Sequence, residues 1–185
     1  MAKIMGFQLK NIKKTRGIEG YGCIATMYLD GKKIGTYADY ADGAMGNAEY
    51  DSKEAEEKMT KVIISYAKKH PSEYVVKLYD QRPKQFKETC QRFKEVHPYI
   101  PDEDITKETM SANDICFIVE DFLLLHDAER RFKTMNKKGY KALFVSEKGE
   151  MISYPSVWTD EKVLNDVKKC NLVGNVYFSI EDFEQ

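Results

Sequence analysis

Apolar and polar residues alternate with a period of two near the start of the chain. Phe7 and Leu9 are separated by a polar residue, and the odd-numbered positions of residues 21–29 are apolar or aromatic. This period is typical of β-strands that bury one face. Asp30 and Gly31 follow directly, and glycine tolerates the positive φ angle that two-residue hairpin turns require. The pattern predicts antiparallel strands over residues 7–14, 21–29 and 33–40, with a short further strand near residues 48–50.

Helical spacing replaces this alternation after the third predicted strand. Apolar residues recur three or four positions apart over residues 55–66, so one face of a helix would be buried. Asp51 or Ser52 can cap the start of this helix, and Pro71 ends it. The aromatic and β-branched residues that follow predict another strand over residues 74–79.

The centre of the chain is predicted to be helical. Pro83 suits the first turn of one helix. The acidic and poorly patterned residues 102–110 are interpreted as a connector. A longer helix is then predicted to start at Ser111, where Asp114 completes a capping box, and to end at Gly139.

The C-terminal part predicts strand, turn, strand, helix and strand. Residues 140–146 and 150–154 form the two predicted strands, Thr159 caps the helix, and residues 175–180 form the last strand. We therefore expect an α+β fold in which two small antiparallel sheet and helix units, each ordered hairpin, helix, strand, are joined by a helical middle. The predicted domains are residues 1–80, 81–138 and 139–185.

Composition narrows the function classes. The 185 residues include 29 basic and 30 acidic side chains, a net charge of -1, so the chain lacks the overall basic excess of many nucleic-acid-binding domains. Hydrophobic residues make up 42% of the chain, which is enough to build a core. No P-loop, GxGxxG, GxSxG or HExxH motif is present. These features argue against the standard nucleotide-binding and hydrolase classes.

The cysteines and the apolar segments indicate a cytoplasmic protein. The four cysteines form no CxxC pair, which argues against a zinc ribbon, and we expect buried free thiols in a reducing compartment. No N-terminal signal segment is recognisable. The most apolar stretch, residues 115–125, is shorter than the about 20 residues that span a bilayer, so no membrane partner is expected. The cysteines are Cys23, Cys90, Cys116 and Cys170.

A glycine-containing acidic loop is the first candidate site. No lysine or arginine occurs over residues 36–52, and clustered carboxylates can bind Mg²⁺, which activates water or stabilises a phosphoryl transition state. The hypothesis is a metal-dependent ribonuclease with Mg²⁺ as cofactor, although no metal ligand is assigned. The alternative is a solvated loop with a helix cap at its end. The candidate catalytic residues are Asp39, Asp42, Glu49 and Asp51.

A basic cluster on the predicted hairpins is the second candidate site. We expect the end of the first strand and the hairpin turn after the second strand to lie close together, so that their cations form a patch for phosphates. Tyr21, Tyr28, Tyr37 and Tyr40 would add stacking faces for bases. The alternative is edge-strand lysines that prevent aggregation. The candidate nucleic-acid-binding residues are Lys10, Lys13, Lys14, Arg16, Lys32 and Lys33.

The N-terminal third also carries a resemblance. Residues 7–13, 20–22 and 28–35 (FQLKNIK, GYG and YLDGKKIG) resemble an N-terminal module of small proteins from Firmicutes phages, plasmids and integrative elements. That group includes anti-CRISPR proteins that block type II RNA-guided nucleases, and part of it is thought to act on the guide RNA. The resemblance implies an inhibitor encoded by a mobile element.

Together these observations predict a mobile-element inhibitor of a host defence system that binds RNA or a ribonucleoprotein. Two alternatives stay open. One is the metal-dependent ribonuclease, and the other is a protein-binding or self-associating adaptor, such as a homodimer, with no role in nucleic-acid binding. The near-zero net charge makes self-association easier than it is for a strongly charged domain.

Overall fold

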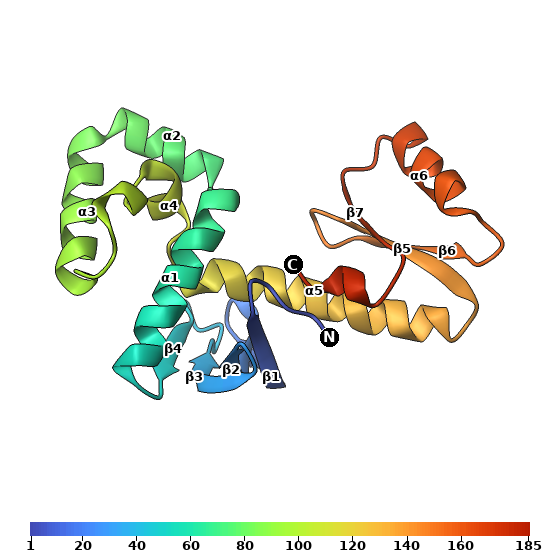
Figure 1. Ribbon diagram of the computed structural model, residues 1–185, viewed down its shortest axis with the longest axis horizontal. Coiled ribbons are helices and arrows are strands. Elements are labelled where there is room, and N and C mark those ends of the chain that lie inside the picture. Colours follow the sequence, from blue (N-terminus) through green and yellow to red (C-terminus); the bar gives the residue numbers. More distant parts are fainter. The chain divides into compact units, whose positions relative to one another are not determined.

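Four antiparallel strands form the N-terminal sheet, in the order β1-β2-β3-β4 (Figure 1). In the computed structural model, which describes residues 1–185, Phe7 lies opposite Leu29. Asp30 and Gly31 have φ angles of 50° and 79°, the left-handed conformation that the predicted two-residue turn requires. The predicted strands are confirmed as β1 (Phe7–Gly17), β2 (Gly20–Leu29), β3 (Lys32–Ala38) and β4 (Asn47–Tyr50).

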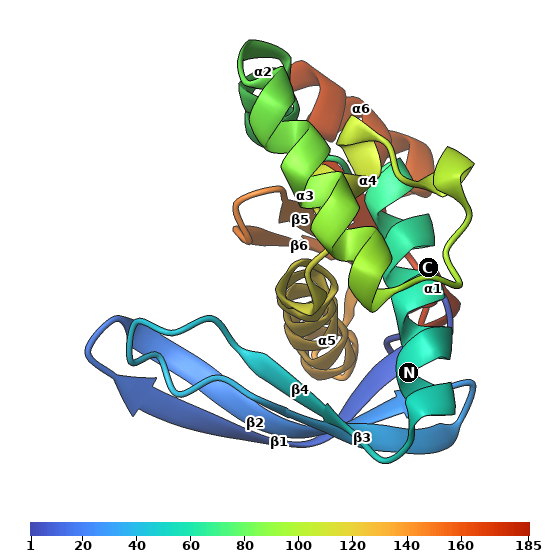
Figure 2. The same cartoon turned by 90° about the vertical axis from the view of Figure 1, so that its left-hand side faces the viewer.

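One face of this sheet is apolar and packs against helix α1 (Lys53–Lys69), which contacts β3 and β4 (Figure 2). Met27 on β2 and Met59 on α1 are completely buried. Ser52, one of the two predicted capping residues, caps this helix. Its hydroxyl accepts a hydrogen bond from the Ala55 N–H at 3.2 Å. Burial of the alternating sheet residues and of one helix face thus forms the core of this unit.

Short helices follow α1. The predicted strand at residues 74–79 is wrong, because these residues lie within α2. Tyr79 anchors that helix: its hydroxyl donates to the Met110 carbonyl at 3.3 Å, and its ring centroid lies 5.1 Å from that of Phe86. The predicted connector at residues 102–110 includes most of a further helix, and α3 begins at its proline, as predicted. The elements are α2 (Glu73–Gln81), α3 (Pro83–Val96), η1 (Asp102–Asp104) and α4 (Lys107–Ser111).

The long helix α5 (Ile115–Asn136) does not start at the predicted residue. Ser111 instead ends α4, and its hydroxyl donates to the Glu108 carbonyl at 2.6 Å. Asp114 caps α5 directly, since its Oδ1 accepts a hydrogen bond from the Cys116 N–H at 2.8 Å. The predicted capping box is therefore replaced by a single aspartate cap.

The C-terminal sheet has the order β6-β5-β7, with α6 on one side (Figure 1). Phe144 on β5 and Val163 on α6 are buried in one cluster between the sheet and that helix. The predicted cap of α6 is confirmed, because the Thr159 hydroxyl accepts a hydrogen bond from the Lys162 N–H at 3.2 Å. The elements are β5 (Tyr140–Ser146), β6 (Met151–Pro155), α6 (Asp160–Lys169), β7 (Gly174–Tyr177) and η2 (Glu181–Phe183).

The last strand is shorter than predicted. It ends at Tyr177, because the N–H groups of Phe178 and Ser179 both donate to Asp182 Oδ2, at 2.7 and 2.8 Å, and not to a neighbouring strand. The α+β class is confirmed. The N-terminal half, however, runs from strands into several helices and does not return to a strand, so it lacks the predicted order of hairpin, helix and strand.

Two compact units divide the chain. Residues 5–119 form one, and residues 120–185 together with Met1–Ile4 form the other, whereas the predicted domain limits were 80 and 138. Residues 81–119 of the predicted helical middle belong to the first unit, where α4 contacts α1 and α2, and residues 120–138 belong to the second. No helix is long and apolar enough to cross a bilayer. We call Met1–Ile4 the N-terminal strap.

The N-terminal strap is held by the C-terminal residues of the same unit. The Lys3 N–H donates to the Phe183 carbonyl at 3.0 Å, and the Gln185 N–H donates to the Lys3 carbonyl at 2.9 Å. The Ala2 N–H donates to Glu129 Oε2 at 2.8 Å. Residues from the two ends of the chain therefore complete one core.

The cysteines are all free, as predicted, but they are not all buried. Cys23 is buried in the sheet, Cys90 and Cys116 are half-buried, and Cys170 is exposed. The exposure of Cys170 contradicts the prediction of four buried thiols. Cys170 follows the final turn of α6 and caps it through its backbone.

Glu129 accepts a hydrogen bond from Ala2, so a substitution there tests how much the N-terminal strap contributes to stability. Its side chain is only 3% exposed and also accepts a hydrogen bond from Lys133 Nζ at 2.6 Å. Burial by itself raises the pKa of Glu129, but the bonds from Lys133 and Ala2 outweigh burial and leave the pKa below its ordinary value. This carboxylate therefore stabilises the fold above its unfolded pKa of about 4.3, and the contribution is lost as the pH falls through the lower folded-state pKa.

We expect Glu129→Gln to lower the free energy of unfolding by about 1–3 kcal/mol at neutral pH, since a charge-assisted buried hydrogen-bond acceptor is weakened. Urea denaturation at neutral pH and below about pH 4 measures the loss, which should shrink at the lower pH. Glu147→Gln, at an exposed turn position, is the matched control and should have little effect. An equal loss at both pH values would contradict the proposed role of the charge.

Candidate functional site

The four carboxylates of the predicted catalytic loop have separate positions. Asp39 Oδ1 accepts a hydrogen bond from the Ala41 N–H at 2.7 Å, and Asp42 Oδ1 accepts one from the Ala44 N–H at 3.1 Å. These bonds shape the connection between β3 and β4. Asp51 forms an ion pair with a lysine, and Glu49 lies exposed on β4.

The structure brings together only two of these four side chains. Asp42 and Glu49 line one shallow depression of about 400 Å³, beside Tyr40 and Met45. Nowhere in the chain do three or more histidine, cysteine, aspartate or glutamate side chains form a group that could hold a metal ion. Mg²⁺ takes six oxygen ligands in near-octahedral geometry, so the predicted metal-dependent catalytic site is not assembled.

The predicted convergence of the basic residues is also wrong. The register places Arg16 opposite Tyr21, next to the turn that joins β1 to β2, and places Lys32 opposite Leu29 at the other end of the ribbon. Phe7, the β1 partner of Leu29, is nine residues from Arg16, which at about 3.3 Å per residue corresponds to roughly 30 Å. Lys32 and Lys33 therefore cannot share a patch with the end of β1.

The charge of Lys33 is also neutralised by an acidic partner, which makes it unavailable to the predicted patch. Lys33 Nζ lies 3.2 Å from Asp51 Oδ2, and both partners of this ion pair, which lies just before α1, are exposed. The other four predicted cations all belong to β1, and none of them forms an ion pair. We call them the β1 cation row: Lys10, Lys13, Lys14 and Arg16.

The β1 cation row lies on the edge strand of the sheet. Lys10 and Lys13 pair with Thr26 and Ile24 on the outer face, whereas Lys14 and Arg16 pair with residues of the opposite face. All of these side chains except the half-buried Lys10 are exposed, because the ribbon extends away from α1 (Figure 2). Both faces of the ribbon end are thus open to a ligand.

Two of the four predicted stacking tyrosines stand at this end. Tyr21 is 75% exposed with the Arg16 guanidinium 5.9 Å from its ring centroid, and Tyr40 is 57% exposed. Tyr28 is half-buried beneath Lys10, whose Nζ lies 4.2 Å from the ring centroid. Tyr37 is only 3% exposed, and its hydroxyl contacts Cys116 Sγ at 3.5 Å, so the prediction of a stacking face is wrong there.

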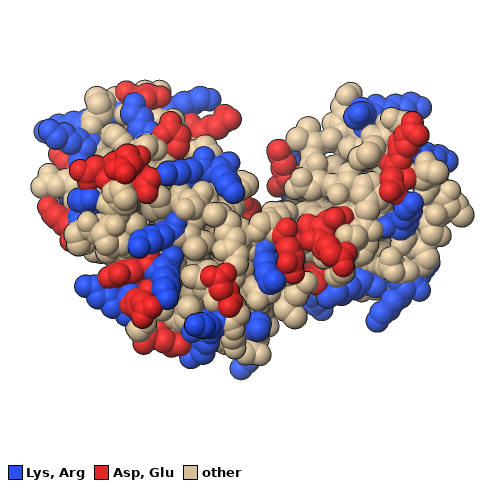
Figure 3. Space-filling view, viewed as in Figure 1, with Lys and Arg blue, Asp and Glu red and all other residues tan.

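Hydrogen bonds join the ribbon end to the loop that follows β3. The Thr15 hydroxyl donates to the Asp39 carbonyl at 2.6 Å, and the Glu19 N–H donates to the Ala41 carbonyl at 2.9 Å. Tyr40 therefore lies at the same end of the sheet as the β1–β2 turn. On the visible face of the unit formed by residues 5–119, basic and acidic side chains are interspersed (Figure 3). The β1 cation row is accordingly a local feature in a mixed surface.

A polar groove in the same unit was not indicated by the sequence pattern. It has a volume of about 700 Å³ and lies between β4, the start of α1, the end of α3 and the start of α5. We call it the β4–α1–α3 groove. Four separate segments form it, and nothing in their local patterns shows that they meet. Its polar lining includes Tyr50, Glu56, His97, Asn113 and Asp114.

The ionisable groups of this groove influence one another. His97 Nδ1 lies 3.0 Å from the Tyr99 hydroxyl. Burial lowers the pKa of His97, although Glu56 opposes the shift, so the imidazole is neutral at neutral pH. Burial, followed by the charge of Glu56, raises the pKa of Tyr50, which therefore stays a neutral phenol.

No protein-family model, curated protein or solved structure matches the chain.

Mg²⁺ provides a direct test of the acidic loop. We expect about 10 mM Mg²⁺ or excess EDTA to leave the melting temperature unchanged, because Asp42 and Glu49 alone supply too few ligands. A ligand at a hundred times its Kd would stabilise the protein by about 2.7 kcal/mol, which thermal unfolding would detect. A rise of several degrees that disappears in Asp42→Asn would contradict this expectation.

Proposed function

We propose that this protein binds single-stranded RNA through the end of the β1–β2 ribbon that carries the turn, and that it acts by binding, without catalysis. The observation that carries the proposal is the β1 cation row, whose four side chains have no carboxylate partner and which ends at Arg16, beside the exposed ring of Tyr21. Cations without a carboxylate partner are available to phosphates.

Single-stranded RNA suits this surface better than a duplex. Exposed aromatic rings stack on bases only when the bases are splayed out, which single strands permit. Tyr21, beside Arg16, and Tyr40 offer two such rings at the end of the sheet that carries Lys14 and Arg16. Each phosphate that the protein neutralises releases condensed counterions, so affinity would fall as the salt concentration rises.

The resemblance of residues 7–35 to the mobile-element module supports a more specific role. It favours the guide RNA of an RNA-guided nuclease as the ligand, and inhibition of that nuclease as the outcome. A protein that covers the guide RNA can block the ribonucleoprotein without cutting either component. The absence of an assembled carboxylate site in this chain supports binding over ribonuclease activity.

A second candidate function is strand addition at the free edge of β1. This strand is 11 residues long and has a neighbour on one side only, so its outer backbone groups could pair with a partner strand. Two copies of β1 placed edge to edge would bring their cation rows together. The two rows of like charge would repel each other. A homodimer through this edge is therefore less favourable than a complex with a polyanionic partner.

The RNA proposal predicts a specific loss of affinity. We expect the triple variant Lys13→Ala, Lys14→Ala, Arg16→Ala to bind a labelled single-stranded RNA at least about tenfold more weakly at moderate salt. The slope of log K against log salt should become shallower by about 2, at roughly 0.7 for each phosphate that is no longer neutralised. Fluorescence anisotropy over a salt series measures both quantities.

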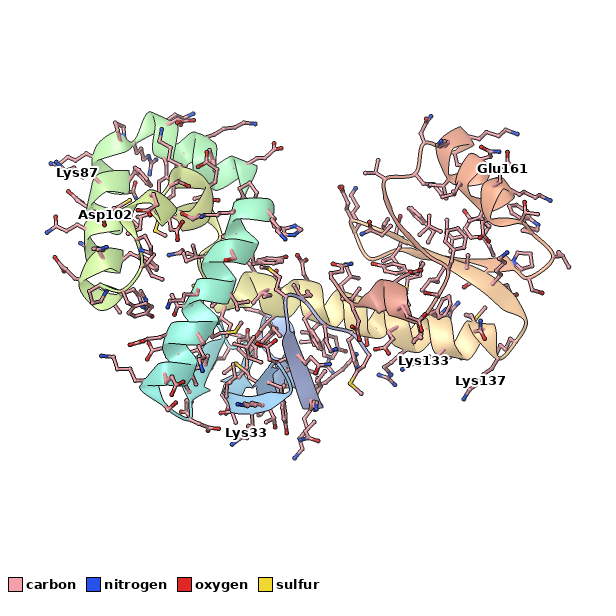
Figure 4. The ribbon with its side chains drawn as sticks, viewed as in Figure 1. Lys33, Lys87, Asp102, Lys133, Lys137 and Glu161 are labelled. Carbon is pink, nitrogen blue, oxygen red and sulfur yellow. The ribbon has the colours of Figure 1, made fainter.

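The matched control removes the same charges elsewhere in the unit. Lys84, Lys87 and Arg92 are exposed on α3 and form no ion pair, and Lys87 projects outward from the helix (Figure 4). Their triple alanine variant should keep RNA binding and inhibition of an RNA-guided nuclease, whereas the β1 variant should lose both. An equal loss of RNA binding in the two variants, or RNA cleavage that EDTA abolishes, would contradict the proposal.

A further inference from the structure

We propose that the β4–α1–α3 groove binds an organic cation, a guanidinium or alkylammonium group, at a site separate from the RNA surface. Its volume of about 700 Å³ lies within the range of small-molecule sites. None of its lining residues belongs to the β1 cation row. This inference goes beyond RNA binding and does not depend on it.

The charges of the groove favour a cation. Glu56 and Asp114 are half-buried, and neither forms an ion pair with a lysine or arginine of the chain. Lys53 also lines the groove but is exposed at the first position of α1. With His97 neutral, the lining carries two negative charges and one positive charge. A partly buried carboxylate without a cationic partner gains from a charge-assisted hydrogen bond with a ligand.

The aromatic rings of the groove favour the same ligand. Tyr50, Phe93 and His97 line it, and the Tyr99 hydroxyl holds the His97 ring in place. The face of a phenol or phenyl ring attracts an organic cation, and the attraction strengthens when water is partly excluded. Ile63 and Ile115 add apolar surface for the alkyl part of such a ligand. Carboxylates beside aromatic faces thus match an alkyl chain that ends in a cation.

Hydrogen bonds within the protein leave these carboxylates available. The Thr60 hydroxyl is already engaged, because it donates to the Glu56 backbone carbonyl at 2.9 Å and not to the side chain. Asp114 Oδ1 accepts the Cys116 N–H at 2.8 Å, which fixes the orientation of the carboxylate. The second oxygen of Asp114 and the Glu56 carboxylate are the acceptors for the ligand.

Titration with agmatine, spermidine and a short capped arginine peptide tests the proposal. Isothermal calorimetry and amide chemical shifts of residues lining the groove should show saturable binding of at least one of these cations. Tighter binding of the peptide would assign the cation to a protein partner, and tighter binding of agmatine or spermidine would assign it to a free amine. Failure of all three to saturate at about 10 mM would overturn the proposal, since Kd would then exceed the millimolar range.

The variant Glu56→Gln, Asp114→Asn removes both charges and keeps the shapes of the side chains. The amide oxygen introduced by Asp114→Asn can still accept the Cys116 N–H, so α5 keeps its cap. We expect at least about a tenfold loss of cation affinity, because two charge-assisted bonds are removed. The affinity for RNA should not change, which separates this site from the RNA proposal.

The control variant Glu88→Gln, Glu103→Gln makes the same charge change outside the groove. Both residues are exposed, and neither lines the groove. Cation affinity should stay at the level of the unaltered protein. If the control loses as much affinity as the groove variant, the cation is held by the general field of the surface, and the proposal fails.

Discussion

The antiparallel register of β1 and β2 determines where every charged side chain of the N-terminal ribbon lies. Pairing of Phe7 with Leu29 places the alternate buried residues of β2 on one face of the sheet, and a shift by one residue would expose them. The same register carries Arg16 to one end and Lys32 to the other. Burial of the apolar face thus decides which cations are neighbours, although the cations contribute little to that burial.

Local chemistry accounts for the elements that the sequence predicted well. The Asp30–Gly31 turn, the Ser52 and Thr159 caps and the proline that begins α3 each depend on a few adjacent residues. Residues 74–79 show the limit of such reasoning. Their tyrosines and valines have high strand propensity, but the partners of α2 are α3 and α4, and packing of Tyr79 against Phe86 and Met110 outweighs that propensity.

The candidate sites were harder to predict than the fold, because they depend on contacts between distant residues. Asp39 and Asp42 form turns with residues two positions further along, a use of carboxylates that cannot be distinguished from metal binding by composition alone. Lys33 is neutralised by Asp51 only because a strand and a helix start meet there. The β4–α1–α3 groove requires four segments, none of which carries a local signal of the meeting.

The N-terminal strap has a consequence for biosynthesis. Residues 5–119 are contiguous and can fold as soon as they leave the ribosome, which agrees with the usual order in which domains emerge. Lys3 is translated before the whole first unit, yet its backbone partners are Phe183 and Gln185. The second unit therefore cannot close until translation has passed Gln185, and the N-terminal strap stays without its partners on the nascent chain until then.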